Sequence, residues 1–170
     1  NGFSGAGAFS DGKLSLYNEE DDDIHVGGNL HKIIGVPETK KLIDYADQIY
    51  LNFGADKHLE GTEYKQEISR INDRAQKEGI RLINIPIRHL GTEKSHEVYG
   101  KLEKYIEDNG VEMMFQTSVT DLIIDNNEIK GVKIKEAKDV DNSKVPEKEI
   151  YADKVVLAVG RKGANWLVNM

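Results

Sequence analysis

Val155–Gly160, with the sequence VVLAVG, is the stretch that decides the fold class of this chain. Five apolar residues without a polar interruption, closed by Gly160, are typical of a strand that is buried on both faces. Such strands occur in parallel sheets covered by helices, so the stretch predicts an α/β fold. Val111–Thr117 is the second compact apolar run of this kind, and the sheet is expected to be incomplete within this sequence.

A β-meander is predicted between these two runs. Val119–Ile124 and Ile129–Ile134 flank Asp125–Glu128, whose Asp-Asn-Asn core favours a hairpin turn. Residues 138–149 are polar and predict a solvated excursion, and residues 150–152 predict a short return strand. The antiparallel meander gives the α/β fold an α+β character.

Upstream of the meander the pattern is mainly helical. Apolar residues at helical spacing predict helices at 37–53, 64–78 and 95–109, with residues 164–170 beginning another. Val98, Leu102 and Ile106 form the apolar stripe of the third helix. Residues 80–89 predict a strand, with Pro86 marking an edge or a break in pairing.

Composition excludes several functions. The net charge of −7, without a basic stripe, argues against nucleic-acid binding. No apolar run is long enough to span a bilayer, so no membrane partner is expected. The absence of cysteine excludes disulfides and thiolate chemistry in this sequence and favours a cytoplasmic setting.

Metal binding is not expected. The acidic run 19–23 lacks the spacing and central glycine of an EF-hand, and indicates a solvated loop. His25 and His31 have no evident third ligand.

Three stretches carry a resemblance to a known family: GFSGAGAFSDGKL at 2–14, RHLGT at 88–92, and ADKVVLAVGR at 152–161, which GANWL follows at 163–167. They resemble the FAD-dependent dehydrogenases of the glutathione-reductase-type flavoprotein fold. The resemblance implies that the chain is an internal portion of such an enzyme, with FAD as cofactor and a small-molecule substrate or NAD(P)H as its partner. It also implies three parts: a flavin-side loop at 1–12, an inserted helix-rich substrate or cap domain at 13–92, and the second half of the FAD-binding domain at 93–170.

The resemblance also places residues around the flavin. The loop beside the flavin ring and pyrophosphate, the meander position that meets the adenine edge, and the strand end beneath the cofactor correspond to Gly5, Ala6, Gly7, Ala8, Ser10, Val119, Ala158 and Gly160. Small residues at these positions would let backbone amides approach the cofactor. The glycines are equally compatible with a flexible loop and an ordinary strand end.

Catalytic residues are not identified by the sequence, but three candidates stand out. His89 is a candidate proton donor, Arg88 a candidate holder of a substrate carboxylate, and Lys13 a candidate neighbour of the flavin. Each has a structural alternative, as a packed or surface residue.

The function expected is hydride transfer between flavin and an unidentified substrate or NAD(P)H. The alternative is a non-catalytic binding or regulatory module that retains a flavoprotein-like fold. An unpaired apolar edge at 155–159 would also be a template for self-association, unless the first 12 residues cover it.

We predict that this 170-residue chain binds FAD weakly or not at all. Gly2, Gly5 and Gly7 have the order GxxGxG, follow no predicted strand and precede no predicted helix, so the phosphate-binding fingerprint is not met. Titration followed by flavin fluorescence checks this prediction. Tight, stoichiometric binding would contradict it.

Overall fold

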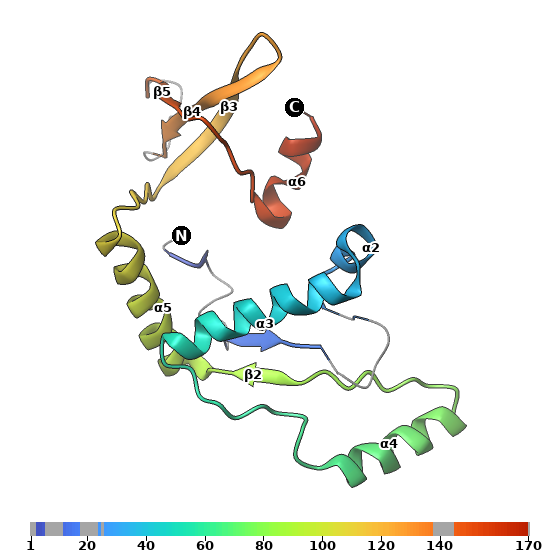
Figure 1. Ribbon diagram of the computed structural model, residues 1–170. Helices are drawn as coiled ribbons and strands as arrows, with labels where there is room; N and C mark the ends of the chain where they lie inside the picture. Colours follow the sequence, from blue (N-terminus) through green and yellow to red (C-terminus); the bar gives the residue numbers. More distant parts are fainter. Residues whose placement is uncertain (1–2, 6–11, 18–23, 25, 138–144, 170) are drawn as a thin grey trace. The chain divides into compact units, whose positions relative to one another are not determined.

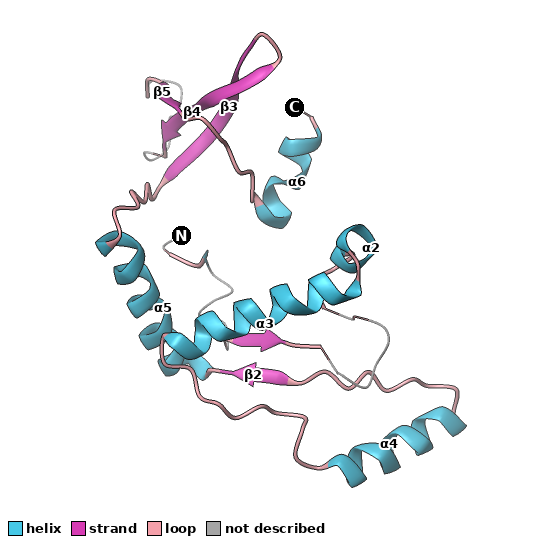
Figure 2. Ribbon diagram, viewed as in Figure 1, coloured by secondary structure: helices cyan, strands magenta, loops and turns pink. Residues whose placement is uncertain are grey.

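The computed structural model describes residues 3–5, 12–17, 24, 26–137 and 145–169. Within these residues the chain is a mixed α/β protein with five helices and two small antiparallel sheets (Figures 1 and 2). The mixed α/β class predicted from the sequence is confirmed, whereas the flavoprotein sheet stays a prediction. The chain divides into two compact units, Asn1–Met113 and Met114–Met170, each considered by itself.

Unit 1 is built around a short antiparallel strand pair and four helices. Its elements are β1 (Lys13–Ser15), α2 (Leu30–Ile34), α3 (Val36–Asn52), α4 (Lys65–Lys77), β2 (Ile87–His89) and α5 (Gly91–Asp108). Lys13 pairs with His89, Leu14 with Arg88 and Ser15 with Ile87. Glu60 forms an isolated antiparallel bridge with Ile87, so a second segment of the chain also pairs with β2.

A tight junction separates α2 from α3. Gly35 has a φ of +86°, a conformation that glycine adopts without strain, and it ends α2 and precedes α3. Pro37 lies in the first turn of α3, where its missing N–H costs no helix hydrogen bond. The fully buried Thr39 hydroxyl donates to the Gly35 carbonyl at 2.8 Å, which fixes this junction.

Aromatic side chains join α3 to α5. The hydroxyls of Tyr50 and Tyr99 are 2.5 Å apart, and their rings are edge-to-face at 5.7 Å. Phe53 and Tyr105 form a second edge-to-face pair at 5.4 Å. Burial and the Tyr50 hydroxyl raise the pKa of Tyr99, so this phenol stays protonated across the physiological range.

The predicted strand at 80–89 is correct only at its end. Residues 80–86 form no strand, and β2 begins immediately after Pro86. Proline has no N–H to donate to a ladder, but its carbonyl remains available and accepts a hydrogen bond from the Leu16 N–H at 2.8 Å.

Unit 2 contains the predicted meander. β3 (Thr117–Asp125), β4 (Glu128–Glu136) and β5 (Lys148–Tyr151) form an antiparallel sheet in this order, and α6 (Gly160–Val168) follows. Asn126 and Asn127 connect β3 to β4 with φ values of +50° and +64°, the backbone signs of a type I′ hairpin turn. The hairpin and the return strand are therefore confirmed.

Two predicted buried strands are wrong in this structure. Residues 111–116 form no strand, and Val111, Met114 and Phe115 are 52%, 46% and 44% exposed. Residues 155–159 also form no ladder with any described strand, and Val156 is 88% exposed. An apolar run becomes a strand only where a neighbour accepts its backbone hydrogen bonds, and the described residues provide none here. Because residues 155–159 form no strand, the structure does not contain the strand edge through which self-association is predicted. Self-association stays a prediction.

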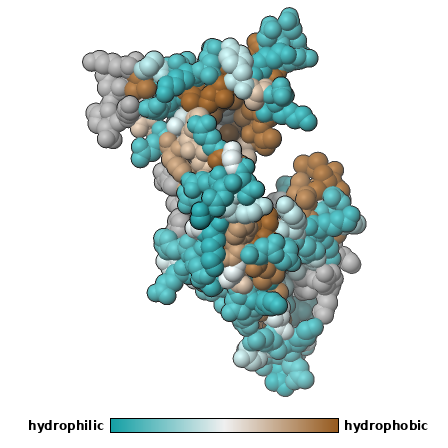
Figure 3. Space-filling view, turned by 60° about the vertical axis from the view of Figure 1, so that its left-hand side comes forward, coloured by the Kyte–Doolittle hydropathy of each residue, from teal (hydrophilic) through white to brown (hydrophobic). Residues whose placement is uncertain are grey.

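Apolar side chains reach the surface of both units (Figure 3). No helix among the described residues combines the length and apolar character needed to cross a bilayer.

Gly131 in β4 lets β5 approach closely, and this contact generates a prediction. A Cβ added at Gly131 would lie 2.0 Å from the Ile150 carbonyl oxygen. We expect Gly131→Ala to lower the free energy of unfolding by about 1–3 kcal/mol, because backbone atoms must move to admit the methyl group. Urea unfolding, with hydrogen exchange of the β4 amides, measures the effect.

The matched control is Gly100→Ala, within α5. Gly100 has nothing within 4 Å of an added Cβ and lies in a helix, so alanine should stabilise by about 0.4–1 kcal/mol. Gly131→Ala should therefore lower the free energy of unfolding, and Gly100→Ala should raise it. Equal effects at the two positions would contradict the crowding argument.

Candidate functional site

The three catalytic candidates all lie on the strand pair β1–β2, but the antiparallel register brings only two of them together. Lys13 lies directly opposite His89, so their side chains share one face of the strand pair. Arg88 pairs with Leu14 and points to the other face, because successive side chains alternate along a strand. The structure therefore places Lys13 beside His89 and separates Arg88 from both.

Arg88 is committed to partners within the protein. Its side chain is only 4% exposed, and its guanidinium forms a two-point ion pair with Asp47 of α3, with Nη2 to Oδ2 at 2.7 Å and Nε to Oδ1. Nη1 donates to the carbonyls of Asp56 and His58. These contacts occupy the donor fork, so we assign Arg88 a structural role in place of the predicted contact with a substrate carboxylate.

His89 is held by a carboxylate. Its Nδ1 lies 2.9 Å from Oε1 of Glu60, and its side chain is 29% exposed. A carboxylate on one ring nitrogen orients an imidazole and leaves the other nitrogen directed elsewhere. This geometry suits a proton donor or acceptor.

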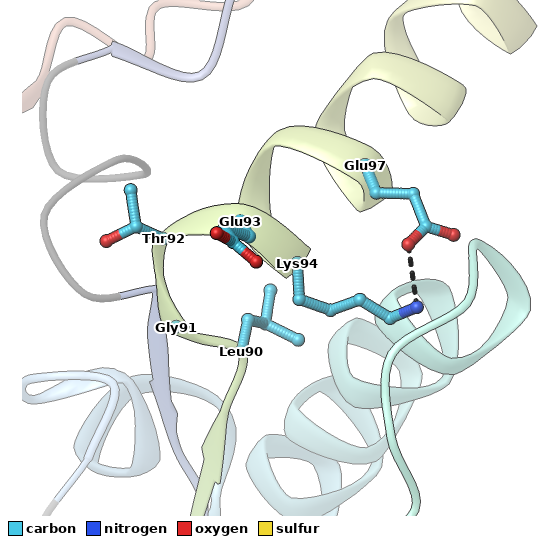
Figure 4. A pocket seen from close by; sticks show the side chains of 6 residues that line it. All are labelled: Leu90, Gly91, Thr92, Glu93, Lys94 and Glu97. Carbon is cyan, nitrogen blue, oxygen red and sulfur yellow. Dashed lines mark hydrogen bonds and ion pairs between the residues drawn. The ribbon is translucent and has the colours of Figure 1, made fainter.

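A cavity of about 500 Å³ opens where α5 begins, and its lining starts at Leu90, the residue after His89 (Figure 4). It is lined by Leu90, Gly91, Thr92, Glu93, Lys94 and Glu97. Lys94 and Lys101 donate to the Glu97 carboxylate at 2.7 and 2.6 Å. These hydrogen bonds, from Lys101 first and then Lys94, lower the pKa of Glu97 to about 2, so it stays ionised.

The end of the glycine-rich loop packs against the same helix start. The Leu90 N–H donates to the Gly12 carbonyl at 2.9 Å, and Gly12 is buried. A Cβ at Gly12 would lie 1.9 Å from the Ser95 hydroxyl oxygen, and the φ of Gly12 is +55°, so any other residue would strain the backbone and displace the Ser95 side chain. Unit 1 thus places Gly12, the helix start and the strand bearing His89 in one region.

The predicted flavin residues are partly described. Ala6, Gly7, Ala8 and Ser10 lie outside the described residues. Gly5 belongs to unit 1, and its Cβ position has nothing within 4 Å.

The other predicted flavin residues belong to unit 2. Val119 lies on β3, the edge strand of the described sheet, and is 42% exposed. Ala158 is exposed, and Gly160 begins α6 with a φ of +65° and open space around its Cβ position.

The sequence did not indicate the partners of Arg88 and His89. Asp47 is 41 residues from Arg88, and Glu60 is 29 residues from His89. Asp47 lies on α3 three residues after Asp44, and nothing in the sequence distinguished one of these two carboxylates from the other as the partner of Arg88. The described residues contain no group of three or more histidine, aspartate or glutamate side chains placed to hold a metal ion.

Comparisons with known proteins give no match. No protein-family model, no curated protein and no solved structure matches this chain significantly.

The buried ion pair yields a prediction. We expect Arg88→Met to lower the free energy of unfolding by about 3–5 kcal/mol, because it leaves the Asp47 carboxylate, only 14% exposed, without a countercharge. Urea unfolding monitored by circular dichroism measures this loss. Adding Asp47→Leu should recover part of the stability, because it removes the uncompensated charge.

Arg70→Met is the control for the same substitution at the surface. Arg70 pairs with Glu67 while 74% exposed, so its loss should change stability by less than about 1 kcal/mol. Similar losses for the two arginines, or a double variant no more stable than Arg88→Met, would contradict the structural role of Arg88.

Proposed function

We propose that the protein is an FAD-dependent oxidoreductase that transfers hydride between flavin and an organic substrate or NAD(P)H. The observation that carries the proposal is the resemblance of two segments, GFSGAGAFSDGKL at 2–14 and ADKVVLAVGR at 152–161, to the flavoprotein family. Between them the chain supplies α5, the β3–β4–β5 meander and an apolar segment, and α6 begins at Gly160. This order is the one that the resemblance implies for the second half of an FAD-binding domain.

The described residues assigned to the flavin are compatible with a cofactor. Gly5 and Gly160 have φ values of +69° and +65°, and an added Cβ at either position would meet no atom within 4 Å. Backbone groups at such positions are accessible to a ligand without interference from a side chain. Val119 lies on β3, an edge strand, which carries backbone groups that no described strand pairs. Each unit separately therefore offers the open backbone that a flavin contact requires.

When bound, FAD would supply the hydride chemistry, and the chain would supply position and proton transfer. His89, oriented by Glu60, is the candidate proton donor or acceptor. Lys13, opposite His89 on β1, contributes positive charge on the same face of the strand pair. Arg88 positions β2 through Asp47 and takes no direct part in the chemistry.

The alternative function, a non-catalytic binding or regulatory module, is favoured by one observation. The arginine that would hold a substrate carboxylate is instead engaged by Asp47 and two backbone carbonyls. A module without catalysis would retain this structural pair and need no flavin.

The test is the visible spectrum of the complete gene product. We expect the purified protein to show the two visible absorption bands of oxidised flavin, to bleach on reduction, and to release FAD on denaturation. A protein that stays colourless after FAD is added would overturn the oxidoreductase proposal and favour the module.

A pair of variants locates the flavin. Gly5 and Gly79 both have positive φ, +69° and +71°, and open space at the Cβ position, so valine strains each backbone similarly. We expect Gly5→Val to lose the flavin bands and Gly79→Val to retain them. Equal retention would contradict the placement of Gly5 beside the cofactor.

A further inference from the structure

The last turn of α5 ends in a closed backbone cap. The Gly110 N–H donates to the Glu107 carbonyl at 2.9 Å. The Val111 N–H donates to the Ile106 carbonyl at 3.2 Å. These two hydrogen bonds define a Schellman motif, in which Asn109 is the C-cap residue and Gly110 follows it with a φ of +80°.

The side chain of Asn109 takes part in the same cap. Its Nδ2 donates to the Tyr105 carbonyl at 2.8 Å, one helical turn earlier. Asn109 and Gly110 are both exposed to solvent, and they form the only Asn-Gly dipeptide among the residues that the structure describes. Glycine has no side chain to hinder its backbone nitrogen, so Asn109 precedes the least hindered amide that a protein can offer.

An Asn-Gly dipeptide contains the groups for its own chemical modification. The backbone nitrogen of the glycine attacks Cγ of the asparagine and forms a new C–N bond. The side-chain nitrogen leaves as ammonia and takes the proton of the backbone nitrogen with it. Water then opens the resulting succinimide ring at either carbonyl carbon and gives aspartate or isoaspartate. Water is the only co-reactant in this deamidation.

In the closed cap the groups that must react are engaged in hydrogen bonds. The Gly110 nitrogen must give up its proton, and this proton lies in the hydrogen bond to the Glu107 carbonyl. The Asn109 amide nitrogen, which must leave, is held by the Tyr105 carbonyl. Deamidation therefore requires the last turn of α5 to open, as helix ends do by local fraying.

The products cannot re-form the closed cap. The succinimide has no N–H at position 110, so the bond to the Glu107 carbonyl is lost. A carboxylate at position 109 has no hydrogen to donate to the Tyr105 carbonyl. Isoaspartate also adds one carbon to the backbone between the donors and the acceptors of the cap.

The new charge acts in the same direction. Deamidation places a carboxylate directly after Glu107 and Asp108, at the negative end of the α5 dipole. The last turn of α5 contains no basic residue, and Lys104 already pairs with Asp108 at 3.0 Å. A third consecutive carboxylate therefore disfavours the helical form of this turn.

We propose that Asn109 is a site of spontaneous deamidation, whose rate is set by opening of the Schellman cap of α5 and whose product keeps that cap open. The modification is irreversible and accumulates with the age of the molecule. The proposal concerns unit 1 alone and does not depend on flavin.

Peptide mass spectrometry of the 170-residue chain, aged in buffer with and without urea, tests the proposal. We expect the mass increase that marks replacement of an amide by an acid at Asn109 in both samples. The rate should be at least about tenfold lower without urea, because the hydrogen bonds of the cap must first open. Asn109→Gln should remove the product, because the longer side chain closes the ring much more slowly.

Glu78→Asn is the matched variant on α4. Gly79 and Ile80 end that helix with the same motif, since their N–H groups donate to carbonyls of the preceding turn at 3.0 and 2.9 Å. The introduced asparagine should deamidate faster than Asn109. The reason is that α4 has no buried residue, whereas α5 buries Val98, so the end of α4 opens more readily.

Asn109→Asp reproduces one product and tests its effect on the cap. We expect hydrogen exchange of the Gly110 and Val111 amides to become about threefold to tenfold faster, because the cap loses a hydrogen bond and gains an unfavourable charge. Asn127→Asp makes the same charge change in the turn between β3 and β4, where its φ of +64° is one that aspartate tolerates. This control should leave both amides unchanged.

Four results would overturn the proposal. They are no product at Asn109 in the folded chain, equal rates with and without urea, slower reaction at the asparagine introduced by Glu78→Asn, and equal exchange rates in Asn109→Asp and Asn127→Asp.

Discussion

The ion pair between Arg88 and Asp47 is the interaction on which the arrangement of unit 1 depends. Arg88 belongs to β2 and Asp47 to α3, while the Arg88 guanidinium also holds the carbonyls of Asp56 and His58. One side chain therefore connects a strand, a helix and the loop that leads toward α4. A guanidinium at this depth requires such a set of acceptors, because an unpaired buried charge costs several kcal/mol. Few apolar side chains are buried among the described residues of unit 1, so this polar network contributes much to fixing the positions of its elements.

Local signals predicted local structure well. The spacing of apolar residues identified α3, α4 and α5, and Asn126-Asn127 identified the turn of the meander, since both signals depend on contacts within a few residues. Pro86 correctly indicated a break, because its missing N–H acts at its own position. The failures at 111–116 and 155–159 have a different origin. The apolar run at 155–159 indicates a preference for burial. Strand formation also requires a pairing partner, which no local pattern specifies.

In the candidate site, too, the sequence predicted local features but not long-range contacts. The sequence could nominate Lys13, Arg88 and His89 by residue type, but their relation depends on the register of β1 and β2. A shift of one residue would put Arg88 beside Lys13 and bury His89. The observed register instead buries the residue that finds a carboxylate in α3 and leaves the imidazole where Glu60 can orient it. The partners Asp47 and Glu60 are distant in sequence, and for this reason they could not be predicted.

The same register links the two cavities of unit 1. One end of the strand pair leads into Leu90 and Gly91, which line the cavity at the start of α5. The residues just beyond the other end, Leu16 and Pro86, line a second, larger cavity against α4. The hydrogen bond from Leu16 N–H to the Pro86 carbonyl closes that end, and the one from Leu90 N–H to the Gly12 carbonyl closes the other. A ligand that stiffens one end of this ribbon must therefore act on a backbone shared with the other end. Since Arg88 lies between the two ends and its ion pair with Asp47 fixes β2 to α3, this pair restrains the strand that joins the two regions.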